Sequence, residues 1–277
     1  MSPAQSQQLI EIRPSAGWRD LGLRELWEYR RLLYMLIWRD VKVRYRQTLL
    51  GAAWVMIQPL LTMLIFTFLL HRVAQLESGE TPYALFVLSG LLPWQFVSSS
   101  ISMSGNSLIS NAHVLSKIYF PRLLIPMSAS LVAIVDLVVN GFLVALMMLY
   151  YGAPPSVHIW AVVPLIALAF LLSFGVGLWL AALNVEYRDI RVLIPFLIQI
   201  WMYLTPVVYP LDELPAPYDR LALLNPATGI IEGFRAAILG RPLVVESIPI
   251  SIGWTIVILL SGALYFRRAE RKFADLI

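Results

Sequence analysis

The chain has 277 residues, of which 59% are hydrophobic and only 14% are charged. A soluble domain carries about 25% charged residues, so this composition excludes a soluble enzyme and favours an integral membrane protein. The net charge of +4 does not indicate nucleic-acid binding, because the basic residues flank apolar segments and face an anionic membrane leaflet or a partner. The absence of cysteine excludes disulfides and thiolate metal sites.

The N-terminal part predicts two regions outside the membrane core. Residues 1–20 are polar and predict a flexible cytoplasmic N-terminus. Over residues 21–47, apolar side chains recur at three- and four-residue spacing or multiples of it: Leu23, Leu26, Trp27, Leu33, Ile37 and Val41. Basic residues lie between and beyond them. This pattern predicts an amphipathic helix in the membrane interface, where the apolar face is buried and Lys and Arg meet the headgroups.

Six apolar stretches are long enough to predict membrane-spanning helices. They lie at about 51–70, 83–103, 123–150, 158–183, 192–209 and 248–266. Together they predict an all-α integral membrane protein with a six-span transmembrane domain over residues 48–277. When the spans are threaded alternately, 17 of the 21 Lys and Arg residues fall on the side of the N-terminus. The positive-inside rule therefore predicts that both termini are cytoplasmic.

The second span sits in an unusually long uncharged stretch. No charged residue occurs from Thr81 through Ala112, and this stretch is too long for one helix. We therefore expect the span to end near residue 103. Residues 111–122, which carry Lys117 and Arg122, then predict a cytoplasmic elbow.

Two features of the later spans concern helix packing or function. Asp136 is the one acidic residue within an apolar stretch, and Asn140 lies one turn further on the same face. An ionisable group at this depth is a functional candidate. However, no basic residue lies within the spans, and this favours an interhelical hydrogen-bond pair used for packing, with Asp136 protonated as one possibility. In the fourth span, Gly175 and Gly177 predict the close approach of a neighbouring helix.

The stretch from Val208 to Ser247 is too polar to span and is rich in proline. Within it, Asn225 and Pro226 predict a helix start, with Asn as the N-cap and Pro in the first position, and Gly240 predicts its end. The enclosed 14 residues would be about 21 Å long, too short to cross a membrane. We expect an outer re-entrant segment between the fifth and sixth spans, lying at the surface or dipping in and returning.

The sequence excludes several chemistries. The three histidines have no neighbours at metal-ligand spacing, and no serine and histidine are arranged as in an intramembrane protease. No Gly-rich loop with Lys-Ser/Thr is present, so the chain does not itself hydrolyse ATP. Two hypotheses remain: an exporter subunit driven by a separate ATPase, or a stand-alone secondary carrier or flippase. One isolated Asp and the lack of a repeat argue against the carrier.

Five short strings decide between these hypotheses. Residues 39–51 read RDVKVRYRQTLLG, residues 90–96 read GLLPWQF, residues 117–122 read KIYFPR, residues 184–190 read NVEYRDI, and Asn225-Pro226 precedes a helix bearing Phe234-Arg235. In this order, they resemble the membrane subunit of type-2 ABC exporters of polysaccharides and polyol phosphates, which move O-antigen, capsule or teichoic acid. The resemblance extends from about residue 20 to the C-terminus.

The resemblance implies a homodimeric permease with two copies of a separate nucleotide-binding ATPase subunit. ATP and Mg would be bound by that partner, and this chain would be no enzyme and bind no cofactor or metal. The residues expected to couple to the ATPase are Asn111, Leu115, Lys117, Tyr119, Phe120, Pro121, Tyr187, Arg188 and Asp189. The outer re-entrant segment would include Pro210, Asn225, Pro226, Phe234 and Arg235.

The implied substrate is a long glycan on a polyprenyl-pyrophosphate lipid, exported across the bacterial inner membrane; we favour O-antigen over capsule or teichoic acid. Arginine binds phosphate bidentately, so the residues expected at the cytoplasmic entrance are Arg39, Arg44 and Arg46. Anchoring to lipid phosphates is the alternative role of these arginines. Aromatic faces bind sugars, and the expected substrate-path residues are Trp54, Phe66, Trp94, Phe96, Trp201 and Tyr203, although membrane aromatics also serve packing and interface belts.

Overall fold

The structure is a computed structural model that describes residues 23–46, 53–76, 79, 81–115, 117, 120–271 and 273. Within these ranges every regular element is helical, and the predicted all-α membrane fold is confirmed. The elements, in chain order, are α1 (Leu23–Glu28), α2 (Arg30–Arg46), α3 (Ala53–Phe66) continuing as the π-helix η2 (Thr67–Val73), α4 (Tyr83–Ser110), α5 (Ala112–Leu115), α6 (Leu124–Tyr151), the 3₁₀ turn η3 (Ile159–Ala161), α7 (Val162–Glu186), α8 (Ile190–Leu204), the 3₁₀ turn η4 (Leu211–Glu213), α9 (Tyr218–Leu223), α10 (Pro226–Leu239) and α11 (Ser247–Glu270). The expected flexible segment 1–20, the first residues of the first span and Tyr119 lie outside the described residues.

Five of the helical segments described are long and apolar enough to cross a membrane. They are Ala53–Val73, Tyr83–Ser110, Leu124–Tyr151, Ile159–Glu186 and Ser247–Glu270. The predicted fifth span at 192–209 is wrong in extent, because α8 has 15 residues and is about 22 Å long, shorter than the hydrocarbon thickness of about 30 Å. The helix ends because Pro206 disfavours helical geometry in the residue before it, and Thr205 is extended.

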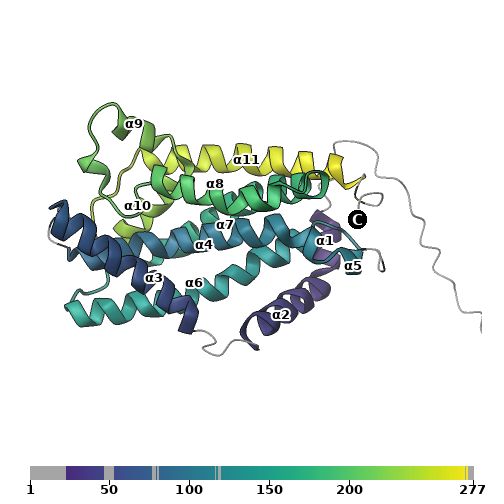
Figure 1. The fold of residues 1–277 in the computed structure, drawn as a ribbon, viewed down its shortest axis with the longest axis horizontal. Coiled ribbons are helices and arrows are strands. Elements are labelled where there is room, and N and C mark those ends of the chain that lie inside the picture. Colours follow the sequence, from purple (N-terminus) through teal and green to yellow (C-terminus); the bar gives the residue numbers. More distant parts are fainter. Residues whose placement is uncertain are drawn as a thin grey trace, which may run out of the picture.

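Helix α4 is the centre of the bundle. Its apolar window is 83% buried within the chain, against 11% for α3 with η2, and it packs against both α6 and α7 (Figure 1). The expectation that the span ends near residue 103 is wrong, since α4 continues to Ser110. The polar residues of its last turns stay helical because they donate back to the helix's own carbonyls: Asn106 to Ser102 at 2.8 Å and Ser107 to Ser104 at 2.6 Å.

Helix α7 approaches two neighbours closely through the glycines that the sequence singles out. A Cβ atom at Gly177 would lie 2.6 Å from the Cβ of Ser104 on α4, and one at Gly175 would lie 2.8 Å from the Cα of Leu259 on α11. Both distances are shorter than real Cβ contacts. The predicted close approach at these glycines is confirmed, and it fixes α7 between α4 and α11.

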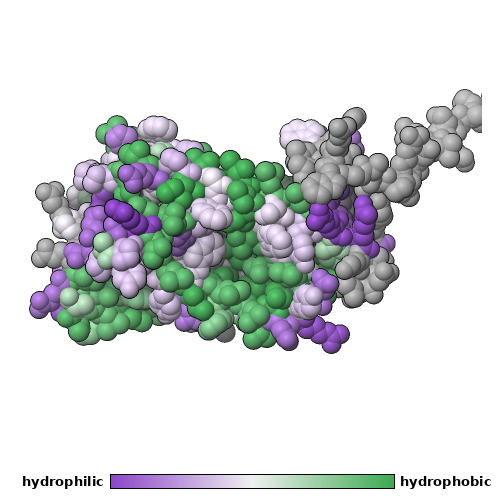
Figure 2. All heavy atoms as spheres, turned by 90° about the horizontal axis from the view of Figure 1, so that it is seen from above, coloured by the Kyte–Doolittle hydropathy of each residue, from purple (hydrophilic) through white to green (hydrophobic). Residues whose placement is uncertain are grey.

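The long helices run along one direction, with the connecting elements gathered at the two ends (Figure 1). α1, α5 and the C-terminal end of α11 lie at one end, and α9 and α10 lie at the other. Green hydrophobic residues dominate the middle of the face in Figure 2, and purple hydrophilic residues gather toward its ends. This arrangement agrees with alternate threading of the spans, while the cytoplasmic placement of the termini stays a prediction.

The predicted amphipathic helix at 21–47 is divided into two helices, α1 and α2, which are separated at Tyr29. α2 packs against α6, with Leu36 buried and Trp38 and Val43 exposed. The C-terminal end of α2 therefore contacts the bundle itself. Its placement in the membrane interface stays a prediction.

Helix α10 begins and ends where the sequence predicts. The side chain of Asn225 accepts a hydrogen bond from the backbone N–H of Ala227 at 3.1 Å, Pro226 is the first helical residue, and Gly240 ends the helix at φ +71°. Its apolar stripe is buried against α4, α7 and α11. The short helix is thus inserted between longer ones.

Candidate functional site

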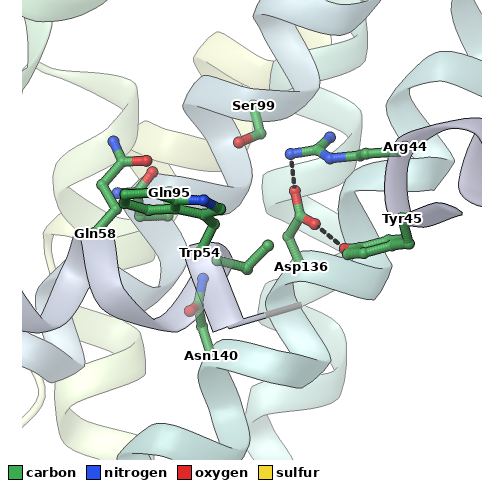
Figure 3. Close-up of a pocket in the computed structure, with 9 residues that line it drawn as sticks. Arg44, Tyr45, Trp54, Gln58, Gln95, Ser99, Asp136 and Asn140 are labelled. Carbon is green, nitrogen blue, oxygen red and sulfur yellow. Dashed lines mark hydrogen bonds and ion pairs between the residues drawn. The ribbon is translucent and has the colours of Figure 1, made fainter. Parts of the chain in front are cut away.

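Two adjoining hollows form one groove along the bundle, which we call the polar groove. The first, of about 190 Å³, is lined by Arg44, Tyr45, Trp54, Val55, Gln58, Gln95, Ser99, Asp136 and Asn140 (Figure 3). The second, of about 430 Å³, is lined by Arg44, Gln58, Thr62, Leu91, Trp94, Gln95, Ser98, Ser99, Ser102, Met103, Pro195, Ile198, Gln199 and Met202. The two hollows share Arg44, Gln58, Gln95 and Ser99. The groove therefore runs from the end of α2, past α3, α4 and α6, to α8.

Arg44 and Asp136 form an ion pair in the polar groove, with Asp136 in the first hollow and Arg44 where the two hollows adjoin. Arg44 Nη2 lies 2.6 Å from Asp136 Oδ2, and Arg44 Nη1 contacts the Met103 sulfur at 2.9 Å. The hydroxyl of Tyr45 donates to the other carboxylate oxygen, Oδ1 (Figure 3). Burial and this hydrogen bond raise the pKa of Tyr45, so its hydroxyl remains a donor at physiological pH. Each oxygen of Asp136 thus has its own donor from α2.

The premise of the preferred prediction for Asp136, that it has no basic partner, is wrong: Arg44 is that partner, and it lies on α2, before the first span. The predicted interhelical hydrogen bond is present, from Tyr45 of α2, and a packing role stays a prediction. Asn140 does not complete the expected pair: within the described structure, its Oδ1 is buried and has no hydrogen-bond partner. Asn140 also lines the groove.

Most of the other lining residues are uncharged, with polar or aromatic side chains. Three glutamines, Gln58, Gln95 and Gln199, come from α3, α4 and α8, and serines of α4 lie between them. Amide and hydroxyl groups donate and accept hydrogen bonds without a fixed charge. The groove therefore suits a hydroxyl-rich ligand along its length and an anion at Arg44.

The predicted substrate-path aromatics lie in different surroundings. Trp54 lines the first hollow and Trp94 the second. Trp94 meets Trp201 edge to face at 5.9 Å, and Trp201 donates from its indole to Asn225 at 2.8 Å. The three others lie elsewhere: Phe66 packs on the larger apolar core, Phe96 is buried within that core, and Tyr203 is exposed.

The three predicted entrance arginines also differ. Arg44 alone among them lines the polar groove. Arg39 donates to Asn111 Oδ1 at 2.6 Å and pairs with Asp40 at 2.8 Å. Arg46, at the last position of α2, is exposed.

The predicted ATPase-coupling residues gather at the end of the bundle that holds α5. Asn111 is the C-cap of α4 and links it to Arg39. Leu115 and Phe120 pack into the smaller apolar cluster, which also contains Leu108 and Leu124. Pro121 is half-buried beside them.

Four other predicted coupling residues are exposed: Lys117, and Tyr187, Arg188 and Asp189 in the turn between α7 and α8. This end of the bundle therefore exposes polar side chains around the smaller apolar cluster.

The predicted outer segment contains a second arginine–carboxylate pair. Arg235 of α10 is fully buried, 2.6 Å from Glu232. It also donates to the carbonyls of Pro206 at 2.7 Å and Val207 at 2.5 Å, and lies 3.8 Å from the ring centroid of Phe86. Phe234 and Pro210 of the predicted segment are also buried. Asn225 and Pro226 start α10. Arg235 thus fixes α10 to α4 and to the chain after α8.

Sequence reasoning missed most of the groove's polar lining. Tyr45, Gln95, Ser99 and Gln199 were not singled out. The usable signal was the presence of glutamines inside apolar stretches, since an amide in the membrane core needs a partner or a water-filled cavity. Among the described residues, no group of three or more His, Cys, Asp or Glu side chains is placed to hold a metal ion.

The apolar helices with a polar groove between them define a multi-pass membrane protein of the transporter class. Residues 31–239 match the ABC-2 type transporter family, and the chain belongs to this family. It is 30% identical over 260 residues to an O-antigen export system permease protein of Myxococcus xanthus, covering 92% of this chain and 98% of the relative. It is 29% identical over 248 residues to the protein of that name from Klebsiella pneumoniae, covering 89% of this chain and 95% of the relative. It is 23% identical over 211 residues to a polysialic acid transport protein of Escherichia coli, covering 74% of this chain and 80% of the relative. Family membership implies an ATPase partner.

Proposed function

We propose that this chain is the transmembrane permease subunit of an ATP-driven exporter that moves a lipid-linked polysaccharide, O-antigen in the first place, across the bacterial inner membrane. Both termini would be cytoplasmic, and the chain itself would perform no catalysis. The observation that carries this proposal is the polar groove, with neutral amides and hydroxyls along its length and Arg44 where its two hollows adjoin. The names of the relatives support the same class of substrate.

The lining of the polar groove fits a passing sugar chain better than a small ion. A moving glycan needs many weak, interchangeable contacts, and neutral hydrogen-bonding groups with indole faces supply them. A selective ion site would need several fixed charges converging on one point. In the described groove the charged lining residues are Arg44 and Asp136, which neutralise one another.

Two copies of the chain would enclose the path. The groove is bordered by α3 and α8, which this chain covers little: the apolar window of α3 with η2 is 11% buried, and Ile194 is the buried residue of α8. A second permease copy facing these helices would complete the wall of the path. Two copies of the nucleotide-binding subunit would then bind the end that holds α5.

The contacts around α5 support transmission from the ATPase. Arg39 connects the elbow to α2 through Asn111. Arg122 donates to the Glu270 carbonyl at 2.7 Å and so connects the other side of the elbow to α11. A push on the elbow would therefore move α2 and α11 as packed bodies. Because Phe120 is buried in the chain's own apolar cluster, exposed Lys117 is the better probe of ATPase contact.

Deletion of the gene tests the function. The expected result is loss of O-antigen from the cell surface with accumulation of its lipid-linked precursor inside, and recovery when the chain is supplied again. Loss of a capsule instead would establish the capsule alternative, which the polysialic acid relative favours. Transport by the purified chain alone in liposomes under a proton or sodium gradient would establish a stand-alone carrier and overturn the proposal.

A further inference from the structure

We infer that Arg44 binds the pyrophosphate of an isoprenoid-linked substrate by exchange with Asp136, which occupies the guanidinium when no substrate is bound. The inference rests on the proposed function and names the part of the substrate that enters the first hollow. Without substrate, the Asp136 carboxylate occupies the position at the Arg44 guanidinium that the phosphate would take. The substrate takes that place only if it competes with Asp136 successfully.

Arg44 has donor capacity beyond its present contacts. A guanidinium has five N–H donors, and the polar contacts of Arg44 in the described chain are one carboxylate oxygen and the Met103 sulfur. A thioether is a weak acceptor. The side chain is 34% exposed and lines both hollows. A second anion can therefore approach the guanidinium from the groove.

Exchange at this pair is energetically feasible. Arg44 is 34% exposed whereas Asp136 is 5% exposed, so the carboxylate needs another partner when Arg44 leaves. The hydrogen bond from Tyr45 remains as that partner. Pyrophosphate offers more charge and more acceptor oxygens than a carboxylate, and arginine binds phosphate oxygens bidentately. The pyrophosphate group thus gains more from Arg44 than Asp136 loses.

The first hollow also fits the sugar attached to the pyrophosphate. Its volume is about 190 Å³, and a cavity of about 150 Å³ accepts a benzene-sized ring. Gln58, Gln95 and Ser99 line this hollow and supply donors and acceptors for hydroxyls. Trp54 lines the same hollow with its side chain half-exposed. These groups suit a pyranose next to the phosphate.

Asp136 sets how strongly an anion must bind in order to enter the site. The carboxylate competes at Arg44 with every anion, and it lowers the apparent affinity of all of them by the same factor. A phosphodiester headgroup carries a single negative charge, so it gains less from Arg44 than a pyrophosphate does.

Binding of farnesyl pyrophosphate to the purified full chain in phosphatidylcholine nanodiscs tests the inference. Arg44→Gln should weaken binding by about tenfold or more, because the phosphate loses its guanidinium. Asp136→Asn should tighten binding by about three- to tenfold, because the competing state is removed. Lys42→Gln is the matched control: it makes the same charge change at an exposed position on the same helix and should leave binding unchanged.

Competition by phosphatidylglycerol in the same discs tests whether the site binds pyrophosphate or any phosphate headgroup. The singly charged phosphodiester should compete poorly in the natural chain and in Asp136→Asn, because removal of the carboxylate raises the affinity for both ligands by the same factor. Unchanged binding by Arg44→Gln, weaker binding by Asp136→Asn, or effective competition by phosphatidylglycerol in the natural chain would each overturn the inference. The Asp136→Asn arm retains Arg44 and decides the question even if Arg44→Gln does not fold. None of these readouts requires glycan export, so the inference and the proposed function can fail separately.

Discussion

Two arginine–carboxylate pairs in this chain have the same N–O distance of 2.6 Å but different surroundings. The side chain of Arg235 is 0% exposed, whereas that of Arg44 is 34% exposed. Arg235 also donates to two backbone carbonyls and stacks on Phe86. Arg44 has the Met103 sulfur as its second contact.

The comparison separates a fixed contact from an exchangeable one. Removing a partner from an enclosed pair leaves an uncompensated buried charge, so the Arg235 pair holds α10 and the chain after α8 in place. Removing a partner from a pair that borders a groove allows water or a ligand to replace it. Distance alone would not distinguish these roles; the exposure and the number of other partners do.

The largest effect is expected from Arg235→Ala. It leaves Glu232 and two carbonyls without their donor and should lower the free energy of unfolding by about 3–5 kcal/mol. Thermal unfolding of the purified chain measures the loss, which should appear as a much lower Tm and poor recovery of monodisperse protein. Arg220→Ala, at an exposed site in α9, is the control and should change stability by less than about 0.5 kcal/mol. Equal effects of the two changes would contradict the fixed role of Arg235.

Gly90→Ala should destabilise the same contact from the α4 side. A Cβ atom there would lie 2.6 Å from Arg235 Nη2 and would also meet the Val207 carbonyl. The expected loss is about 1–3 kcal/mol, as for other overpacked sites. Gly141→Ala in α6 has nothing within 4 Å of its new Cβ and should be neutral or stabilise by up to about 1 kcal/mol. A tolerated Gly90→Ala would mean that Arg235 is free to move.

Arg39→Ala should weaken the connection between the elbow and α2 without unfolding the chain. The purified permease–ATPase complex should still hydrolyse ATP, but export per ATP hydrolysed should fall by about three- to tenfold, the equivalent of about 1 kcal/mol for the lost charged hydrogen bond to Asn111. Paired ATPase and transport assays measure the ratio. Arg31→Ala, at an exposed site on the same helix, should leave it unchanged. An unchanged ratio in Arg39→Ala would exclude α2 from transmission.

The smallest effect is expected from Trp54→Ala. One aromatic face contributes about 0.5–1.5 kcal/mol, so export should fall only about two- to tenfold, and Trp54→Phe should restore most of it. Surface glycan per cell measures the rate. Trp160→Ala removes an exposed indole outside the polar groove and should have no effect. A complete loss of export in Trp54→Ala would indicate a structural role for this residue.

Local signals in the sequence predicted several features correctly. Asn225, Pro226 and Gly240 set both ends of α10, because capping depends on neighbouring residues. Pro206, which ends α8 early, is a local signal of the same kind, but the apolar residues around it favour a longer span. The contact between Arg44 and Asp136 joins residues far apart in sequence and depends on how α2 packs against α6. No spacing pattern encodes such a contact. The same holds for the enclosure of Arg235 by Pro206, Val207 and Phe86.

Export by the double variant Arg44→Gln/Asp136→Asn tests most directly whether the exposed pair is a binding site. The two amides can hydrogen-bond to each other, so the packing of α2 on α6 is preserved without a cation. If Arg44 serves to bind the substrate's pyrophosphate, surface glycan in cells carrying the double variant should be as low as with Arg44→Gln alone. Recovery of export to the natural level by the double variant would show that the pair only holds the helices together.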